Sequence, residues 1–216
     1  MPLVPGDARA LIASRLRPSP IPGLSEIRLY APDEHSGLGR FSSTPPYWAY
    51  AWGGGLALAR HLAAHPEIVR DRRILDFGAG SGLLAIAAAK AGATAVAATD
   101  IDPLAQAAIA LNAEANGVAV TLLTGDLTAP DAALPNVDVV LAGDVFYLPK
   151  VARRTMPFLT RCAAAGMTVL IGDPYRAPLP RGKLRLIAEY PVADMGRAIG
   201  AGPATGAVFS LPPPET

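Results

Sequence analysis

Short apolar runs alternate with helical patterns through the central part of this chain. The apolar run Arg73–Phe77 predicts a buried strand, and the segment Leu83–Lys90 behind it predicts a helix. Further strands are expected at 94–99, 120–123, 137–142 and 167–172, and further helices at 104–116 and 149–165. Strands separated by helices favour a parallel sheet with helices on both of its faces.

The two ends of the chain depart from this alternation. Residues 184–190 and 207–211 predict two more strands with no convincing helix between them, so we expect the sheet to end in an antiparallel pair. Before the alternating region, 25–30 predicts an accessory strand and 56–64 a helix. The predicted fold class is α/β, with a doubly wound, mostly parallel sheet of seven strands. One domain spans 1–216, with an accessory part at 1–66 and a core at 67–211.

Three alternating glycines, Gly78, Gly80 and Gly82, follow the first strand of the core. A dinucleotide-binding turn needs the spacing G-x-G-x-x-G, which places a pyrophosphate over the helix N-terminus. The spacing here is G-x-G-x-G, and Asp76 precedes it where a carboxylate repels a pyrophosphate and attracts an ammonium group. S-adenosylmethionine has no phosphate and carries an amino group and a sulfonium. The turn therefore predicts that cofactor, and an NAD-dependent or non-catalytic nucleotide-binding protein is the rival interpretation.

Acidic residues also follow the next two strands. Asp100 is placed to accept hydrogen bonds from ribose hydroxyls, as in other mononucleotide-binding halves of doubly wound sheets. Ile101 is expected against the adenine ring, and Asp126 is placed to accept from the adenine amino group. Taken alone, each carboxylate is as well explained as an ordinary loop residue as it is by contact with a cofactor. Three at successive strand ends are much less expected by chance.

Composition and charge limit the function further. The 216 residues carry a net charge of +1 and no long basic run, so no nucleic-acid partner is predicted. The single cysteine excludes an internal disulfide, and no segment resembles a secretory signal or a membrane span. His61 and His65 have helical spacing, but Pro66 ends that helix, which favours a role at its C-terminus over a metal site. We expect a cytoplasmic monomer without a metal or a membrane partner.

The acceptor chemistry is expected past the carboxyl ends of the strands, where the strand order reverses. The segment from Asp144 to Tyr147 follows the fourth strand of the core, and the segment from Asp173 to Arg176 follows the fifth. Methyltransferases that act on planar nitrogens commonly carry Asn/Asp-Pro-Pro-Tyr after strand four. This chain has the Asp and the Tyr but neither Pro, which disfavours a nucleobase or glutamine acceptor and favours an aliphatic amine.

An aliphatic amine must lose its proton before it accepts a methyl group, and a lysine in water has a pKa of about 10.4. Desolvation against aromatic side chains lowers that pKa. Tyr47, Trp48, Tyr50 and Trp52 are candidates for such walls, although core packing is an equally good role for Tyr47 and Tyr50. A purely structural role for the Asp144 carboxylate is the alternative to a catalytic one.

Several segments together resemble the family of electron transfer flavoprotein β-subunit lysine methyltransferases, among the seven-strand protein lysine methyltransferases. They are 46–60, 74–82, 100–103, 141–147 and 171–174, and the resemblance runs from about Ile27 to Leu211. The aromatic segment and Ala-Gly-Asp-x-Phe-Tyr carry it more specifically than the glycine turn does. The family hallmark after strand four, Asp/Glu-x-x-Tyr/Phe, is met by Asp144 and Tyr147.

The resemblance and the residues together define a candidate site and an activity. The predicted cofactor contacts are Trp52, Asp76, Gly78, Ala79, Gly80, Gly82, Asp100, Ile101, Asp126 and Leu127. Asp144 and Tyr147 are the predicted catalytic residues, and Trp48 and Phe146 join them as predicted substrate contacts. The implied activity is S-adenosylmethionine-dependent methylation of lysines in the flavoprotein β subunit. A ribosomal protein or a small-molecule amine is the alternative acceptor.

Overall fold

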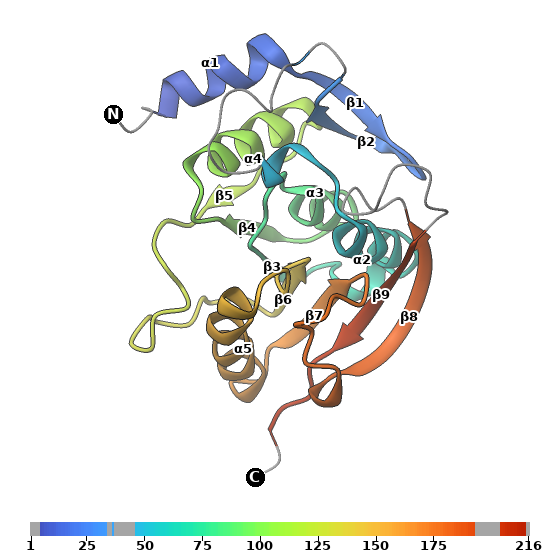
Figure 1. Cartoon of the computed structure of the whole chain (residues 1–216), viewed down its shortest axis with the longest axis vertical. Coiled ribbons are helices and arrows are strands. Elements are labelled where there is room, and N and C mark those ends of the chain that lie inside the picture. Colours follow the sequence, from blue (N-terminus) through green and yellow to red (C-terminus); the bar gives the residue numbers. More distant parts are fainter. Residues whose placement is uncertain (1–4, 34–35, 37–45, 193–203, 215–216) are drawn as a thin grey trace.

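A seven-stranded sheet forms the centre of the structure, a computed structural model that describes residues 5–33, 36, 46–192 and 204–214. Its strands are β3 (Arg73–Phe77), β4 (Ala95–Thr99), β5 (Thr121–Leu122), β6 (Val139–Gly143), β7 (Thr168–Asp173), β8 (Arg185–Val192) and β9 (Ala204–Ser210). They lie in the order β5-β4-β3-β6-β7-β9-β8 (Figure 1). Strands β3 to β7 pair in parallel, and β9 pairs antiparallel with both β7 and β8. The predicted doubly wound sheet with an antiparallel C-terminal pair is confirmed.

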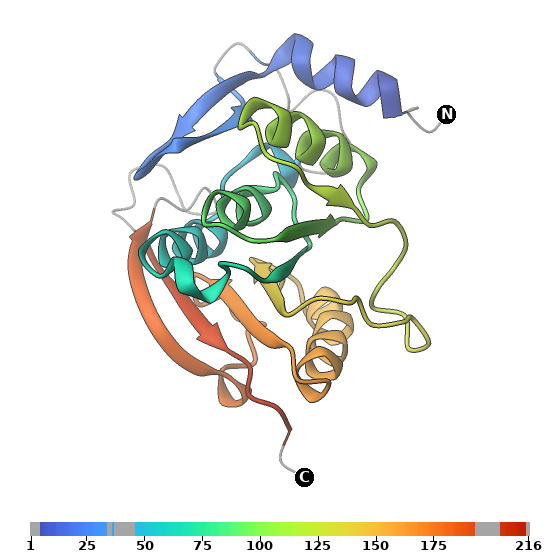
Figure 2. The same ribbon diagram turned by 180° about the vertical axis from the view of Figure 1, so that it is seen from behind.

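Helices cover both faces of this sheet, as the alternation of strands and helices predicted. Helices α2 (Gly53–Ala64), α3 (Leu83–Lys90) and α4 (Pro103–Ala115) lie on one face, and α5 (Pro149–Ala164) lies on the other (Figures 1 and 2). Successive side chains of a strand point to opposite faces. In β3, Ile74 therefore packs in the cluster beneath α2 and α3, and its neighbour Leu75 packs in the cluster beneath α5.

The N-terminal part contains a helix and a strand that the sequence pattern did not predict. Helix α1 (Pro5–Arg15) packs on α4, and β1 (Arg17–Ile21) pairs antiparallel with β2 (Leu24–Ala31), which contains the predicted accessory strand. This ribbon and α1 lie beside α4 at one end of the molecule (Figure 1). Strand β1 contains Pro18 and Pro20, which cannot donate to a strand ladder and are tolerated at a sheet edge.

The predicted division at residues 66 and 67 stays a prediction. Helix α2 lies before that boundary, and it packs against β7, β8 and β9 of the sheet. Its first turn is glycine-rich because it approaches the strand ends closely. A Cβ on Gly54 would lie only 2.2 Å from the carbonyl oxygen of Gly172, and a Cβ on Gly172 only 2.1 Å from that of Gly54. Helix α2 begins at Gly53, earlier than the predicted residue 56.

Replacing Gly54 by Ala is expected to destabilise the fold. The added methyl group has no room against the Gly172 carbonyl, and overpacking of this kind costs about 1–3 kcal/mol in the free energy of unfolding. Urea denaturation followed by circular dichroism measures this free energy. The matched control is Gly182→Ala, because no described atom lies within 4 Å of a Cβ at Gly182. Equal stability of the two variants would contradict the close approach.

Candidate active site

The strand order reverses between β3 and β6, and the acidic residues predicted from the sequence lie at this edge of the sheet. From β3 the order continues to β4 and β5, whereas from β6 it continues to β7, so the two halves diverge at this point. Open α/β sheets bind ligands in the crevice outside such a switch point. Asp76 lies in β3, and Asp144 directly follows β6. Asp100 directly follows β4.

The glycine turn between β3 and α3 is held against the end of β4. Gly78, Gly80 and Gly82 have φ angles of +68°, +52° and +78°, which explains why glycine stands at each of these alternating positions. The N–H groups of Gly78 and Ala79 both donate to the Thr99 carbonyl at 3.0 Å. The N–H of Gly80 then donates to Asp100 Oδ2 at 2.8 Å. The turn and the first acidic loop therefore form one connected unit.

Asp76 is a buried carboxylate beneath this turn, with 1% of its surface exposed. Its Oδ2 accepts a hydrogen bond of 2.9 Å from the N–H of Ala85, in the first turn of α3. Gly82, the N-cap residue of α3, has no side chain that could accept a hydrogen bond from this first turn, so Asp76 takes that role. Burial raises the pKa of Asp76 to about 7, and the nearby Asp100 also raises it. An ionised carboxylate here is therefore costly unless a cation compensates it.

The Asp100 carboxylate is anchored by backbone donors on both of its oxygens. Oδ1 accepts from the N–H of Asp102 at 3.0 Å, and Oδ2 accepts from the N–H of Gly80. An ionised carboxylate offers about four acceptor positions, so further hydrogen bonds are available to a ligand. Burial raises the pKa of Asp100, and the backbone hydrogen bonds oppose that rise. Ile101 beside it is 79% exposed, as an apolar face for a ligand requires.

Asp126 and Leu127 lie on the loop after β5. The Asp126 side chain accepts hydrogen bonds from the N–H and the hydroxyl of Thr128 and forms an ion pair with Arg154 of α5. The hydroxyl hydrogen bond of Thr128 is the main cause that lowers the pKa of Asp126. Leu127 packs against the cluster beneath α5. Contact of either residue with an adenine ring stays a prediction.

Four aromatic side chains gather beside the carboxyl edge. The ring of Tyr47 lies 5.7 Å from that of Trp52 and 5.5 Å from that of Tyr147, and Tyr50 lies 5.9 Å from Trp52, measured between ring centroids. The indole N–H of Trp52 donates to the Tyr47 carbonyl at 2.7 Å. Tyr47 and Tyr147 are exposed, at 44% and 42%. We call these four residues the aromatic wall.

Trp48 and Phe146 do not join the aromatic wall, although both were predicted to contact the substrate. Trp48 is 4% exposed and packs with side chains of α1 and α4, and Phe146 is 0% exposed in the cluster beneath α5. Neighbouring side chains point to opposite sides in both segments. Trp48 and Phe146 face the core, whereas their sequence neighbours Tyr47 and Tyr147 are exposed. Contact of either residue with the substrate stays a prediction.

Asp144 holds the N-terminus of α2 in place. Its Oδ1 accepts from the N–H of Gly54 at 3.1 Å, and its Oδ2 accepts from the N–H of Gly55 at 2.6 Å. These are orphan donors of the first helical turn, and Trp52 at the N-cap supplies no side-chain hydrogen bond. Asp144 also has a φ of +58°, in the left-handed region. The Asp144 carboxylate therefore caps the glycine-rich first turn of α2, and the sequence pattern alone did not indicate this role.

Arg176 forms an ion pair with Asp144, and no role for it was predicted from the sequence. It follows β7 in the segment Asp173–Arg176, and its guanidinium carbon lies 6.0 Å from the centroid of the Trp52 ring. Burial raises the pKa of Asp144, whereas the Arg176 charge and the two glycine N–H groups lower it. The signal in the sequence was a cation three residues after an acidic strand end, at the same edge of the sheet as Asp144.

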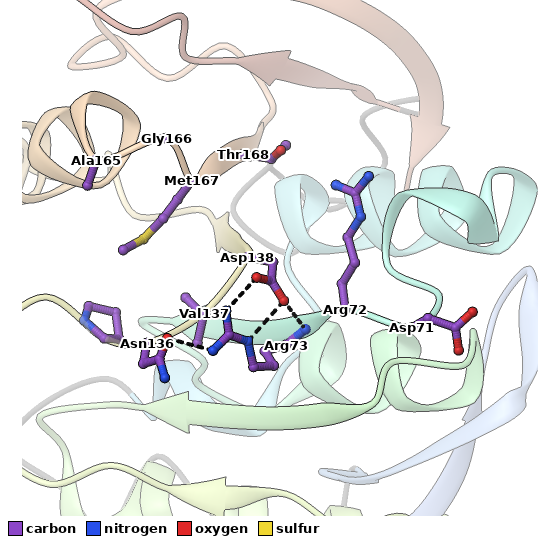
Figure 3. A pocket seen from close by; sticks show the side chains of 11 residues that line it. Asp71, Arg72, Arg73, Asn136, Val137, Asp138, Ala165, Gly166, Met167 and Thr168 are labelled. Carbon is purple, nitrogen blue, oxygen red and sulfur yellow. Dashed lines mark hydrogen bonds and ion pairs between the residues drawn. The ribbon is translucent and has the colours of Figure 1, made fainter.

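The opposite edge of the sheet carries a separate Asp–Arg pair. Asp138, just before β6, accepts hydrogen bonds from the Arg73 backbone and side chain (Figure 3). The Arg73 hydrogen bond lowers the pKa of Asp138 to about 2. The pair lines an open hollow of about 700 Å³ that also includes Arg72 and Thr168. Because it lies at the amino ends of the strands, this pair provides controls for the site at the carboxyl ends.

The described residues contain no group of three or more His, Cys, Asp or Glu side chains arranged to hold a metal ion. None of the helices within these ranges has the length and apolar character needed to cross a membrane. His61, considered above, instead lies 2.9 Å from the Tyr190 hydroxyl through its Nδ1.

Comparisons with known proteins give consistent matches. A family model described as Ribosomal protein L11 methyltransferase (PrmA) matches residues 62–146. The electron transfer flavoprotein beta subunit lysine methyltransferase of Rattus norvegicus is 37% identical over 174 residues, covering 78% of this chain and 68% of the relative. The Homo sapiens protein of the same name is 36% identical over 174 residues, covering 78% and 66%. This chain thus spans about two thirds of the length of these relatives.

A solved structure agrees with the fold. The crystal structure of ribosomal protein L11 methylase from Lactobacillus delbrueckii subsp. bulgaricus matches with a TM-score of 0.50 and 26% identity, covering 71% of this chain and 77% of that chain.

Proposed function

Because this chain belongs to the electron transfer flavoprotein beta subunit lysine methyltransferase family, we propose that it methylates lysine side chains of that flavoprotein subunit. The single observation that carries the proposal is Asp144, a carboxylate at the switch point beside the aromatic wall. Such a carboxylate accepts from an ammonium group, and aromatic side chains desolvate it. A cytoplasmic location, a monomeric state and the absence of nucleic-acid and membrane partners stay predictions.

The turn after β3 fits S-adenosylmethionine as the methyl donor. Asp76 is a buried carboxylate whose pKa burial raises to about 7, and it would accept a hydrogen bond from the cationic amino group of the donor. Asp100 has acceptor positions left for the ribose hydroxyls, and Ile101 offers an apolar face to the adenine. The three positive-φ glycines let the ligand approach the backbone closely. When bound, this donor supplies a methyl group already activated by its sulfonium.

The contribution of the chain itself is mainly positioning. Asp144 would orient the lysine nitrogen, and its two α2 N–H donors keep the carboxylate fixed while it does so. The aromatic wall would exclude water and lower the pKa of the lysine toward the neutral form that can react. Tyr147, which is exposed and whose ring is tilted against that of Tyr47, would guide the alkyl chain of the lysine.

A ribosomal protein is the second candidate acceptor, because residues 62–146 match the family model of ribosomal protein L11 methyltransferases. A competition assay decides between the acceptors. Purified flavoprotein β subunit, ribosomal protein L11 and a small primary amine are incubated together with the protein and S-adenosylmethionine labelled in its methyl group.

We expect most of the label on the flavoprotein β subunit, and peptide mass spectrometry should place it on lysine. Label mainly on the ribosomal protein would establish the second candidate. Label on neither protein would refute protein-lysine methylation, and label on the amine alone would indicate a small-molecule enzyme. Calorimetric titration with NAD in place of S-adenosylmethionine tests the nucleotide-binding rival, and we expect no binding of NAD.

A further inference from the structure

Two carboxylates at the carboxyl edge share one guanidinium group. Arg176 Nη1 forms an ion pair with Asp144 Oδ1, and the same nitrogen lies 3.9 Å from Asp173 Oδ2. Asp144 directly follows β6 and Asp173 is the last residue of β7, and because these neighbouring strands are parallel, the two side chains meet at the same edge. With both carboxylates ionised, this trio carries one negative charge in excess. A further cation would balance it.

The two carboxylates are not equally satisfied. Asp144 receives the two N–H groups of α2 in addition to Arg176. Asp173 is fully buried, and its Oδ1 accepts from the N–H of Arg176 at 2.7 Å. Its Oδ2 has no hydrogen-bond partner among the described residues. Buried polar atoms without a partner are rare and costly. Burial raises the pKa of Asp173 to about 7, as expected for an incompletely compensated carboxylate.

The Arg176 guanidinium lies against Asp144, where the substrate lysine would bind according to the proposed function. A lysine ammonium that binds Asp144 beside the aromatic wall needs the position that the guanidinium now holds, against Asp144 and near the Trp52 ring. The backbone of Arg176 is meanwhile fixed by its hydrogen bond to Asp173. The side chain can therefore pivot from Asp144 toward Asp173 Oδ2 while its backbone stays in place.

We propose that Arg176 is a switch residue that pairs with Asp144 in the substrate-free protein and moves to Asp173 when a substrate ammonium takes its place on Asp144. This inference rests on the proposed function, because it assumes that the acceptor is a lysine. It assigns Asp173 as a positioning residue, which acts on the substrate only through Arg176. The oxygen Asp173 Oδ2, which has no hydrogen-bond partner among the described residues, then accepts the guanidinium in its second position.

The switch predicts that the role of Asp173 depends on Arg176. In Asp173→Asn, the amide keeps an oxygen for the Arg176 N–H but offers no negative charge to the guanidinium. Arg176 then stays on Asp144, and KM for the protein substrate should rise about tenfold, since a hydrogen bond to a charged group contributes about 1.5 kcal/mol or more. The value of kcat should change less than threefold, because the bound complex is otherwise the same.

The double variant separates the switch from a structural role. In Arg176→Gln no guanidinium competes for Asp144, so adding Asp173→Asn to it should leave KM within twofold of that of Arg176→Gln alone. A tenfold rise of KM in both backgrounds would overturn the switch and indicate that Asp173 acts structurally. No rise in either background would overturn it as well. Asp138→Asn, which breaks the Asp–Arg pair at the opposite edge, is the matched control and should leave KM unchanged.

A second measurement uses the unaltered protein, in case Asp173→Asn fails to fold. The wild-type chain is crystallised with S-adenosylhomocysteine and a peptide of the substrate that contains the target lysine. We expect Arg176 at hydrogen-bond distance from Asp173 Oδ2 and the lysine nitrogen on Asp144. A bound lysine with Arg176 still on Asp144 would overturn the switch while the proposed function stands. Absence of methylation by the wild-type protein would instead contradict the proposed function itself.

Discussion

Replacing Asp144 by Asn is expected to lower kcat for lysine methylation by about 10²- to 10⁴-fold, the usual contribution of a group that handles a proton or orients it in the reaction. The amide keeps the size of the side chain and one acceptor oxygen, but it loses the charge that would hold an ammonium group. Cofactor affinity should stay within threefold, because Asp144 follows β6 whereas most of the predicted cofactor contacts lie within β3 or after β3, β4 and β5. Steady-state methylation kinetics and calorimetry with S-adenosylmethionine measure the two quantities.

Asparagine is preferred to alanine at this position because Asp144 also caps α2, and the amide oxygen keeps an acceptor for one of the two capping N–H groups. Alanine would leave the N–H groups of Gly54 and Gly55 without their acceptor, at a cost of about 1–3 kcal/mol for a buried donor. A loss of activity in Asp144→Ala would therefore mix unfolding with chemistry. Asp138→Asn is the control at the opposite end of β6 and should keep full activity. Equal loss of cofactor binding and of turnover in Asp144→Asn would refute the separation of roles.

Replacing Asp76 by Asn is expected to weaken S-adenosylmethionine binding by about 10- to 100-fold, since a charged hydrogen bond contributes about 1.5–3 kcal/mol. The asparagine oxygen can still accept from the Ala85 N–H, so α3 keeps its first-turn hydrogen bond. The substitution thus removes the charge and leaves the fold. Calorimetry gives the dissociation constant, and thermal melting without ligand checks the fold. An unchanged dissociation constant would show that Asp76 is only a cap for α3.

The pH dependence of binding provides an independent check on Asp76. Burial raises its pKa to about 7, so below that pH the carboxyl is protonated and must lose its proton to bind an ammonium group. The dissociation constant should fall about tenfold for each pH unit from 5 toward 7 and then level off. In Asp76→Asn this dependence should vanish. A profile that persists in the variant would assign the titration to another group, such as Asp173.

The raised pKa of Asp76 also affects the stability of the fold, which falls with rising pH, whereas ligand binding becomes tighter. The folded protein retains the Asp76 proton up to a pH of about 7, whereas an unfolded chain loses it near its ordinary pKa of about 4. The contribution of Asp76 to stability is therefore largest at low pH and is lost as the pH rises from about 4 to about 7. The ionised Asp76 that binds the ligand is therefore also the form in which this residue contributes least to stability.

The central elements of the fold followed from the sequence because their patterns are strong and local. The run from Arg73 to Phe77 is mostly apolar and is followed by the glycine turn, whose three glycines occupy the positions with positive φ angles. Strand β1 did not follow, because Pro18 and Pro20 argue against a strand and only pairing with β2 stabilises it. Tertiary contact overrides local propensity in such segments.

The positions of single candidate residues were predictable from the sequence, whereas contacts between distant segments were not, and the roles of these residues stay predictions. Asp76 and Asp100 were recognised by their position at strand ends. Arg176 was not assigned a role, because its pairing with Asp144 depends on how two loops meet across the sheet edge. The burial of Trp48 and Phe146 likewise depends on which side of a short turn faces the core. Sequence spacing does not record that orientation.

The central claim is that the carboxyl edge between β3 and β6 is a methyl-donor site beside an amine-binding carboxylate. Crystallisation of the wild-type protein with S-adenosylhomocysteine tests it most directly. We expect the amino group of the ligand to lie over the glycine turn and point toward Asp76, its ribose to bind Asp100, and its sulfur to face Asp144. A ligand bound elsewhere, or with its amino-acid end turned away from Asp76, would contradict it.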